Sequence, residues 1–150
     1  MRTLIAAMAA LVLAAAPGLA AAQDCPCGGG TRIQQPNTVA TLLGNKWVCA
    51  TAGGDRWQEF HTGNTAAGGA LTDYKKGSGH PKDPTKVVGS WRVTGNGANT
   101  RAEYNYGPGH VYAYTVCQDG ASVNFCGATN VLGATLNPAG VGAVTPCGPV

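Results

Sequence analysis

Hydrophobic and polar residues alternate along short stretches in the middle of the chain. The stretch 56–61 is a clear case. Its residues Trp57, Glu59 and His61 fall on one face, and the residues between them fall on the other. Successive side chains of a β-strand point to opposite faces of a sheet, whereas a helix repeats every 3.6 residues. The alternation therefore predicts strands.

Turn-forming residues divide the chain between residues 38 and 136 into short segments at intervals of about 12 residues. Pairs such as Gly53-Gly54 and Asp119-Gly120 mark these divisions, and regular punctuation of this kind is typical of an antiparallel meander. The predicted strands are Lys46–Thr51, Arg56–His61, Ala70–Lys75, Lys86–Thr94, Thr100–Tyr106, His110–Cys117, Ser122–Cys126 and Val131–Leu136.

About eight short strands are enough to close a small barrel, and closure removes the exposed edges of a sheet. We therefore predict an all-β fold, a single antiparallel meander that forms a small barrel, with a β-sandwich as the alternative. The barrel domain is expected over 39–136, after an extended N-terminal arm over 23–38 and before a Gly/Pro-rich tail over 137–150. Val39–Leu43 fits either one helical turn or the start of a strand.

The turn at Gly107–Gly109 decides where four tyrosines lie. A three-residue loop, with a positive φ at Gly109, places them on one face, whereas a four-residue loop shifts the register by one residue and separates them. We favour the three-residue loop. It pairs Tyr106 with His110, Tyr104 with Tyr112, and Ala102 with Tyr114.

These four tyrosines are the candidate ligand-binding residues. Tyr104, Tyr106, Tyr112 and Tyr114 could form an aromatic platform for a sugar ring or an apolar ligand. The alternative is that they line the core or stiffen the sheet through cross-strand pairs. The three tryptophans are expected in the core or as plugs at a barrel end; they are Trp47, Trp57 and Trp91.

Composition supports a folded, exported protein. Charged residues make up 11% of the chain and glycine accounts for 23 residues, without the three-residue period of collagen. Residues 1–22 have the pattern of a signal peptide: Arg2, the apolar run Leu4–Ala16, and small residues before Gln23. The run is shorter than the ~20 residues that span a bilayer. We expect a periplasmic or extracellular location, no membrane span, and a monomer.

Six cysteines follow the predicted cleavage site, and an even number in an exported chain favours disulfide bonds. A two-residue turn at Asp119-Gly120 would place Cys117 opposite Ser122, so that Cys126 lies ~13 Å further along. A disulfide needs Cα atoms within ~7 Å, which disfavours Cys117–Cys126. The candidates for disulfide bonding are Cys25, Cys27, Cys49, Cys117, Cys126 and Cys147.

Two other interpretations of Cys25-Pro26-Cys27 stay open at this point: a soft-metal site, for example for Cu(I), and a redox-active pair. We favour structural disulfides because an exported protein enters an oxidising compartment, and we expect no metal and no cofactor.

The charge balance is close to neutral. The chain has ten Lys and Arg residues and seven Asp and Glu residues, and removal of Arg2 with the signal peptide leaves a net charge of +2. This small excess argues against a nucleic-acid partner. The densest basic segment, Lys75 to Lys86, is expected to be a solvated loop.

Two short motifs resemble the Gly-x-Trp opening of lipocalin-like (calycin-type) barrels: Leu43-Gly44-Asn45-Lys46-Trp47, with one extra residue, and Val88-Gly89-Ser90-Trp91. The segment from Asp73 through Pro84, together with Val88–Trp91 and Tyr104-Asn105-Tyr106, is similar to small secreted bacterial proteins of unassigned function. The resemblance covers about residues 40–136. It implies a barrel that holds a small apolar ligand, or one that inhibits proteases, as related periplasmic barrels do.

No motif of a known catalytic type is present. Glu59 and His61 are the best candidate acid–base pair, because side chains two residues apart on a strand lie ~6.5–7 Å from each other. His61, His80 and His110 lack the spacing of metal ligands.

The sequence therefore favours a binding module for an unknown apolar small molecule or glycan. The alternative is a protein-binding module, such as a periplasmic protease inhibitor, that uses the loop Gly77–Pro84 or the N-terminal arm. A hydrolase built on Glu59 and His61 is the least favoured of the three.

Overall fold

The computed structural model describes residue 27 and residues 30–52, 55–73, 86–127, 131–140 and 147–148. The predicted signal peptide over 1–22 lies outside the described residues. So do the loop 77–84 and His80, and most of the basic segment between residues 75 and 86. Within the described part of the chain, no helix has the length and apolar character needed to cross a membrane.

All eight predicted strands are present, and each boundary differs from its prediction by at most two residues. Glycines and Asx–Gly pairs end the strands where the sequence indicated. The strands are β2 (Lys46–Ala52), β3 (Asp55–His61), β4 (Gly69–Asp73), β5 (Lys86–Thr94), β6 (Arg101–Asn105), β7 (Val111–Asp119), β8 (Ser122–Cys126) and β9 (Val131–Asn137).

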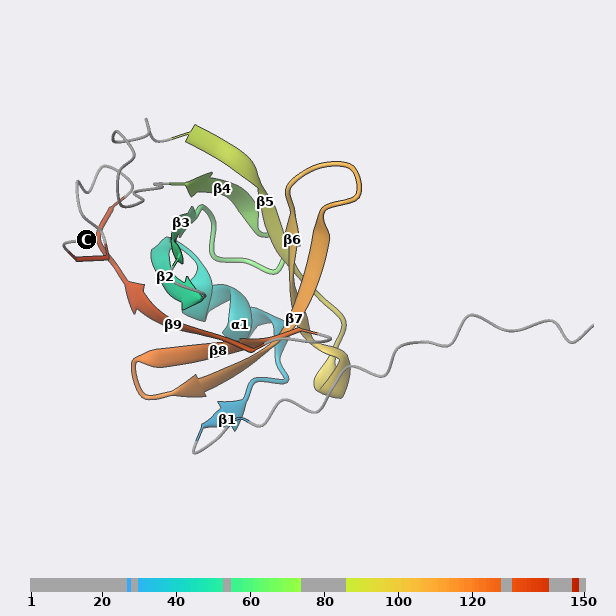
Figure 1. Cartoon of the computed structure of the whole chain (residues 1–150). Coiled ribbons are helices and arrows are strands. Elements are labelled where there is room, and N and C mark those ends of the chain that lie inside the picture. Colours follow the sequence, from blue (N-terminus) through green and yellow to red (C-terminus); the bar gives the residue numbers. More distant parts are fainter. Residues whose placement is uncertain are drawn as a thin grey trace, which may run out of the picture.

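The sheet closes on itself. Each strand from β2 to β9 pairs antiparallel with the next, and β9 returns to pair with β2, from Trp47↔Asn137 to Ala50↔Ala134. The result is the predicted closed antiparallel barrel of eight strands (Figure 1). Because the ring is closed, each of these eight strands pairs with a neighbour on both sides, and none is an edge strand.

Three further elements were not predicted as such: β1 (Thr31–Arg32), the helix α1 (Pro36–Leu43) and the 3₁₀ turn η1 (Gly97–Asn99). β1 pairs with the second half of β7, outside the closed ring. The expectation of an extended arm up to residue 38 is wrong, because α1 begins at Pro36. Proline suits the first turn of a helix, where its fixed φ is already helical and its missing N–H has no partner to lose.

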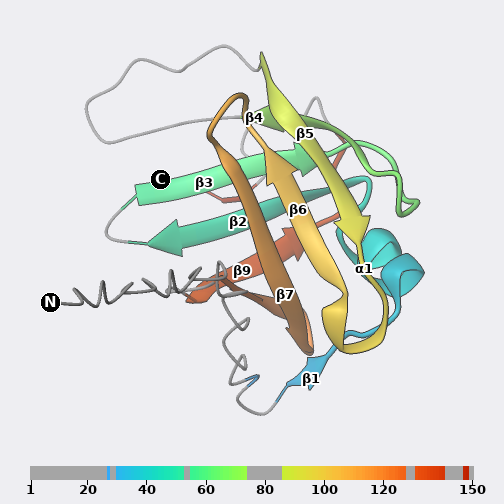
Figure 2. The same ribbon diagram turned by 90° about the vertical axis from the view of Figure 1, so that its right-hand side faces the viewer.

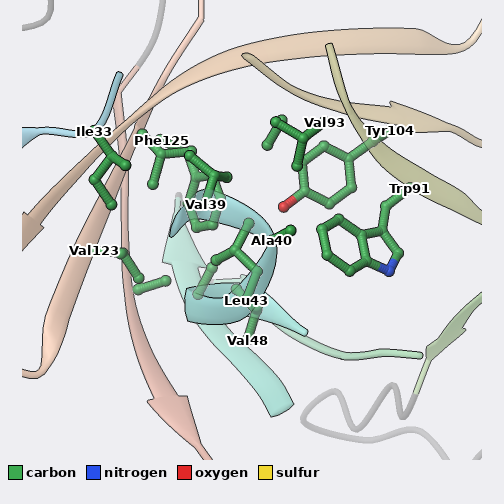
Figure 3. Packing of buried hydrophobic residues seen from close by; sticks show 14 of the residues in the cluster. Ile33, Val39, Ala40, Leu43, Val48, Trp91, Val93, Tyr104, Val123 and Phe125 are labelled. Atoms are coloured by element: carbon green, nitrogen blue, oxygen red, sulfur yellow. The ribbon is translucent and has the colours of Figure 1, made fainter. Parts of the chain in front are cut away.

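Helix α1 closes one end of the barrel, where it lies beside the ends of β2 and β5 (Figure 2). Its side chains Val39, Ala40 and Leu43 are fully buried. They pack among inward-facing residues of the strands, which include Val48 and Trp91 (Figure 3). The apolar face of α1 and the barrel interior thus form one continuous hydrophobic core.

Trp91 is in this core, as predicted, and its indole N–H donates a hydrogen bond to the backbone oxygen of Thr62 over 3.0 Å. Trp47 is buried but does not plug a barrel end. It packs with Phe60 in a second cluster, together with Ala139 and Cys147. Because Val48 faces the interior, the alternation along β2 turns Trp47 to the outer surface of the barrel.

Among the described residues, two disulfide bonds join distant segments: Cys27–Cys117 and Cys49–Cys147. Cys126 is also disulfide-bonded. These bonds fit an oxidising environment outside the cytoplasm. Because Cys27 bonds to Cys117, the soft-metal and redox interpretations of Cys25 and Cys27 as a pair are wrong.

The exclusion of a Cys117–Cys126 bond is confirmed, but the register used to reach it is wrong. Asp119 pairs with Ser122, so Cys117 lies opposite Asn124. The turn is centred on residues 120 and 121, because Gly120 takes the positive φ of the first turn position, +59°. Cys126 is therefore two residues, not four, beyond the position opposite Cys117.

Candidate functional site

The end of the barrel away from α1 holds a cavity of about 370 Å³. Its walls come from the inward-facing positions of β2, β3, β6, β7, β8 and β9. The lining residues are Val48, Ala50, Trp57, Glu59, His61, Tyr104, Tyr106, Tyr112, Tyr114, Phe125 and Leu132.

The predicted register of the tyrosine hairpin is confirmed. Tyr104 pairs with Tyr112, and Ala102 pairs with Tyr114. The backbone N–H of Tyr106 donates to the oxygen of His110 over 3.0 Å, and Gly109 has a φ of +79°. The three-residue loop therefore brings all four tyrosines to the cavity.

The tyrosine rings pack against one another from the floor of the cavity to its rim. Tyr104, which is 5% exposed, stacks nearly parallel to Tyr106 with ring centroids 6.5 Å apart, and Tyr114 meets it edge-on at 5.8 Å. Tyr112 lies at the rim, 45% exposed, and its ring is 6.1 Å from that of Tyr106. Tyr104 therefore belongs to the core, as the second alternative expects, whereas Tyr112 is open to solvent.

His61 forms part of the cavity floor and is fully buried. Its Nδ1 lies 3.1 Å from the backbone oxygen of Glu59, and its Nε2 lies 3.0 Å from the hydroxyl of Tyr104. A carbonyl oxygen can only accept, so Nδ1 carries the proton and Nε2 accepts from Tyr104. Burial lowers the pKa of His61 to about 4, although the contact with the Glu59 backbone oxygen acts in the opposite direction. His61 is therefore neutral at pH 7.

Glu59 lies on the same face of β3, between His61 at the floor of the cavity and Trp57 at its mouth. The hydroxyl of Tyr106 is 2.9 Å from Oε1 and 2.8 Å from Oε2 of its carboxyl group. Burial raises the pKa of Glu59 to about 7; the Tyr106 hydrogen bond lowers it, and the neighbouring Asp73 raises it further. Asp73 pairs directly with Glu59 across β3 and β4, so both occupy the same face of the sheet.

Trp57 differs from its prediction. It is 37% exposed at the mouth of the cavity, so it is neither a core residue nor a plug. Its partner across β2 and β3 is Ala50, whose small side chain leaves space beside the indole. Sequence reasoning grouped Trp57 with Trp91 because residue type alone does not indicate which end of a barrel a strand position occupies.

The predicted acid–base pair is brought to one cavity but is not coupled. His61 contacts the backbone oxygen of Glu59 rather than its carboxyl group, which bonds to Tyr106. The imidazole bonds to Tyr104 on its other side. Within the described parts of the chain, no three His, Cys, Asp or Glu side chains gather as metal ligands.

Several cavity residues were missed from the sequence: Val48, Ala50, Phe125, Leu132 and the neighbouring Asp73. The period-2 pattern of Ser122–Cys126 placed Phe125 on the face of Val123, and this was the available signal. A second hollow of about 390 Å³ was also missed. It lies on the outer side of β2, β3, β8 and β9 beside the Cys49–Cys147 disulfide, and includes Gln58, whose buried Oε1 has no hydrogen-bond partner among the described residues.

Scans against protein-family models, curated proteins and solved structures each find no match to this chain.

Proposed function

We propose that this protein is a binding module that holds a small, partly apolar molecule in the open end of its barrel. The observation that carries the proposal is the asymmetry of the barrel: α1 fills one end, and the other contains a cavity of about 370 Å³. Small-molecule sites are typically concave and mostly apolar, with a few placed polar groups. Here the polar groups are the carboxyl group of Glu59 and the tyrosine hydroxyls.

The walls of the cavity are suited to binding because they are already formed. The cavity residues stand on paired strands of a closed sheet, and Tyr104 and Tyr106 are fixed by hydrogen bonds to His61 and Glu59. Little side-chain freedom remains to be lost when a ligand enters, which favours affinity.

The resemblance of Val88–Trp91 to the Gly-x-Trp motif of lipocalin-like barrels supports the same proposal, because those barrels hold small apolar ligands. The signal-peptide pattern of residues 1–22 supports export, so the ligand is expected to be met in the periplasm or outside the cell. A glycan is the other class of ligand that the tyrosines suit.

The experiment is a fluorescence titration of the purified protein with a panel of small aromatic molecules, lipids and glycans. Trp57 is at the mouth, whereas Trp47 and Trp91 are buried, so a ligand in the cavity should change the emission of Trp57 most. Trp57→Phe should remove most of the signal change, and this variant identifies the indole that responds.

Ala50→Phe is the variant that tests the cavity itself. Ala50 lines the cavity opposite Trp57, and a phenyl ring there would occupy the space of the ligand. The variant should bind at least ~10-fold more weakly while a folded circular dichroism spectrum is kept. No response to any compound in the panel, or binding that survives this substitution unchanged, would count against the proposal.

The two other functions have less support. A protease-inhibitor role depends on the loop 77–84 or the N-terminal arm; the loop lies outside the described residues, as do residues 23–26, 28 and 29 of the arm. A hydrolase would use Glu59 and His61, whose side chains are each bonded to a tyrosine rather than to each other. No observation favours either role over ligand binding.

A further inference from the structure

Among the described residues, the one charged side chain that lines the cavity is a carboxylate. No lysine or arginine is among its lining residues, whereas the carboxyl group of Glu59 faces it and Asp73 is the cross-strand neighbour of Glu59. Two described lysines occupy the inward register nearby. Lys46 is directed elsewhere, because its Nζ donates to the backbone oxygens of Thr41 and Leu42 at the end of α1. Lys86 is the cross-strand partner of Asp73, not of Glu59.

Aromatic rings surround this carboxyl group. Tyr106 holds it by hydrogen bonds, Tyr104 and Tyr112 flank Tyr106, and Trp57 precedes Glu59 by two residues on the same strand face. The faces of aromatic rings carry negative potential and attract cations, most strongly where water is partly excluded. A carboxylate among aromatic faces is therefore an arrangement that favours a positively charged ligand with an apolar body.

We propose that the ligand is a small organic cation, an amine or a quaternary ammonium compound, with its charged group beside Glu59 and its apolar part against the tyrosines. This inference rests on the proposed binding function and names the class of ligand. An organic anion would meet the carboxylate of Glu59, and the described lining residues include no lysine or arginine to balance it. A neutral glycan would leave that charge without a counter-ion in a partly buried site.

The ionisation of Glu59 gives the inference a pH signature. The groups that face it are Tyr106, which directly follows β6, Asp73 from β4, and His61 from its own strand; the facing residue on β2 is the apolar Val48. Lys86 of β5 lies one strand further away, paired with Asp73. The neighbouring tyrosines Tyr104, Tyr112 and Tyr114 complete the wall. Since the carboxyl group loses its proton near pH 7, affinity for a permanent cation should rise as the pH increases from 6 to 8.

The test compares two molecules of the same shape. Phenyltrimethylammonium carries a positive nitrogen where tert-butylbenzene carries a neutral carbon, so isothermal titration with each measures the effect of charge alone. The parent protein should bind the cation about tenfold or more tightly than its neutral counterpart at pH 8. The preference should shrink at pH 6.

Glu59→Gln keeps the shape of the side chain and removes its charge. The preference for the cation should fall to about parity in this variant, and binding of tert-butylbenzene should change little. The matched control is Glu103→Gln, which removes a carboxylate from the outer face, where Glu103 pairs with Arg92. This control should keep the preference.

The outcomes separate the two proposals. Equal binding of both molecules by the parent protein, or an unchanged preference in Glu59→Gln, would overturn the cation inference and leave the binding function standing. Binding of neither probe would overturn the cation inference. If the wider panel of compounds also gave no response, the proposed function would fail with it. Circular dichroism and thermal melts of both variants check that they are folded.

Discussion

The two ends of the barrel are made by the same strands but by different kinds of side chain. At the closed end, aliphatic residues of α1 such as Leu43 and Val39 form one buried cluster with Trp91 and Leu71 of the sheet. At the open end, hydroxyl-bearing rings and one carboxyl group surround a cavity. The difference indicates a division of roles: the closed end stabilises the fold, and the open end is available for a ligand.

His61 and Tyr104 lie at the boundary between the two ends. Both are buried in the core, yet both face the cavity, and the hydrogen bond between them satisfies the polar atoms that this position would otherwise leave unpaired. A substitution at the closed end should therefore mainly lower stability, and a substitution at the open end should mainly weaken binding.

Leu43→Ala should have the largest effect on stability. Leu43 is fully buried between the helix and the barrel, and loss of its side chain should lower the free energy of unfolding by ~2–5 kcal/mol. Urea denaturation measures this loss. Affinity for a cavity ligand should be unchanged under conditions where the variant is folded. A loss of stability below about 1 kcal/mol would mean that α1 does not seal this end.

The pH dependence of stability should separate Glu59 from His61. The carboxyl group of Glu59 titrates near 7 in the folded protein and near 4.5 when unfolded, so its contribution to stability falls as pH rises through this range. His61 titrates near 4 when folded and near 6.5 when unfolded, so its contribution rises with pH. Between about pH 4.5 and 6.5 these two slopes oppose each other.

Glu59→Gln should therefore expose the slope of His61. The free energy of unfolding of this variant should rise by about 2–3 kcal/mol more than that of the parent between pH 4.5 and 6.5. Denaturation curves at several pH values measure the difference. Identical profiles for variant and parent would contradict the raised pKa of Glu59.

Tyr104→Phe tests the boundary between the two ends. The variant keeps the ring but leaves Nε2 of His61 as a buried acceptor without a donor, which should cost ~1–3 kcal/mol. Tyr112→Phe is the matched control, because its hydroxyl is at the exposed rim, and it should cost almost nothing. Equal losses in the two variants would contradict the hydrogen bond to His61.

Tyr112→Ala should have the smallest effect on stability and a clear effect on binding. The ring is half exposed and packs beside Tyr106 at the rim, so its loss should change the free energy of unfolding by less than about 1 kcal/mol. Ligand affinity should fall, because the rim of the cavity loses a wall. Unchanged affinity for every ligand that the parent binds would place the site elsewhere.

The sequence predicted those parts of this fold that depend on local chemistry. Glycines at turns fixed the eight strands, and the Gly107–Gly109 loop fixed the register that joins Tyr104 to Tyr112. The face shared by Glu59 and His61 followed from the two-residue period of β3. Each of these signals lies within a few residues of the feature that it predicts.

The rest depends on contacts between distant segments. Which cysteine bonds to Cys117 is decided by the path of β1 beside β7, and the burial of Trp47 involves the distant residues 139 and 147 as well as its strand neighbours. Trp57 is exposed because its strand position falls at the open end. The predicted turn at Asp119-Gly120 was one residue too early, and this error shifted the pairing predicted for Cys117 by two residues.

The most direct test of the account is a map of where a ligand binds. Backbone amide chemical shifts, followed by NMR during titration with phenyltrimethylammonium, report each end of the barrel separately. We expect shifts concentrated at Trp57, Glu59 and the hairpin 104–114, with α1 unaffected. Shifts centred on residues 36–43, or spread evenly over the barrel, would contradict a barrel that is sealed at one end and receives its ligand at the other.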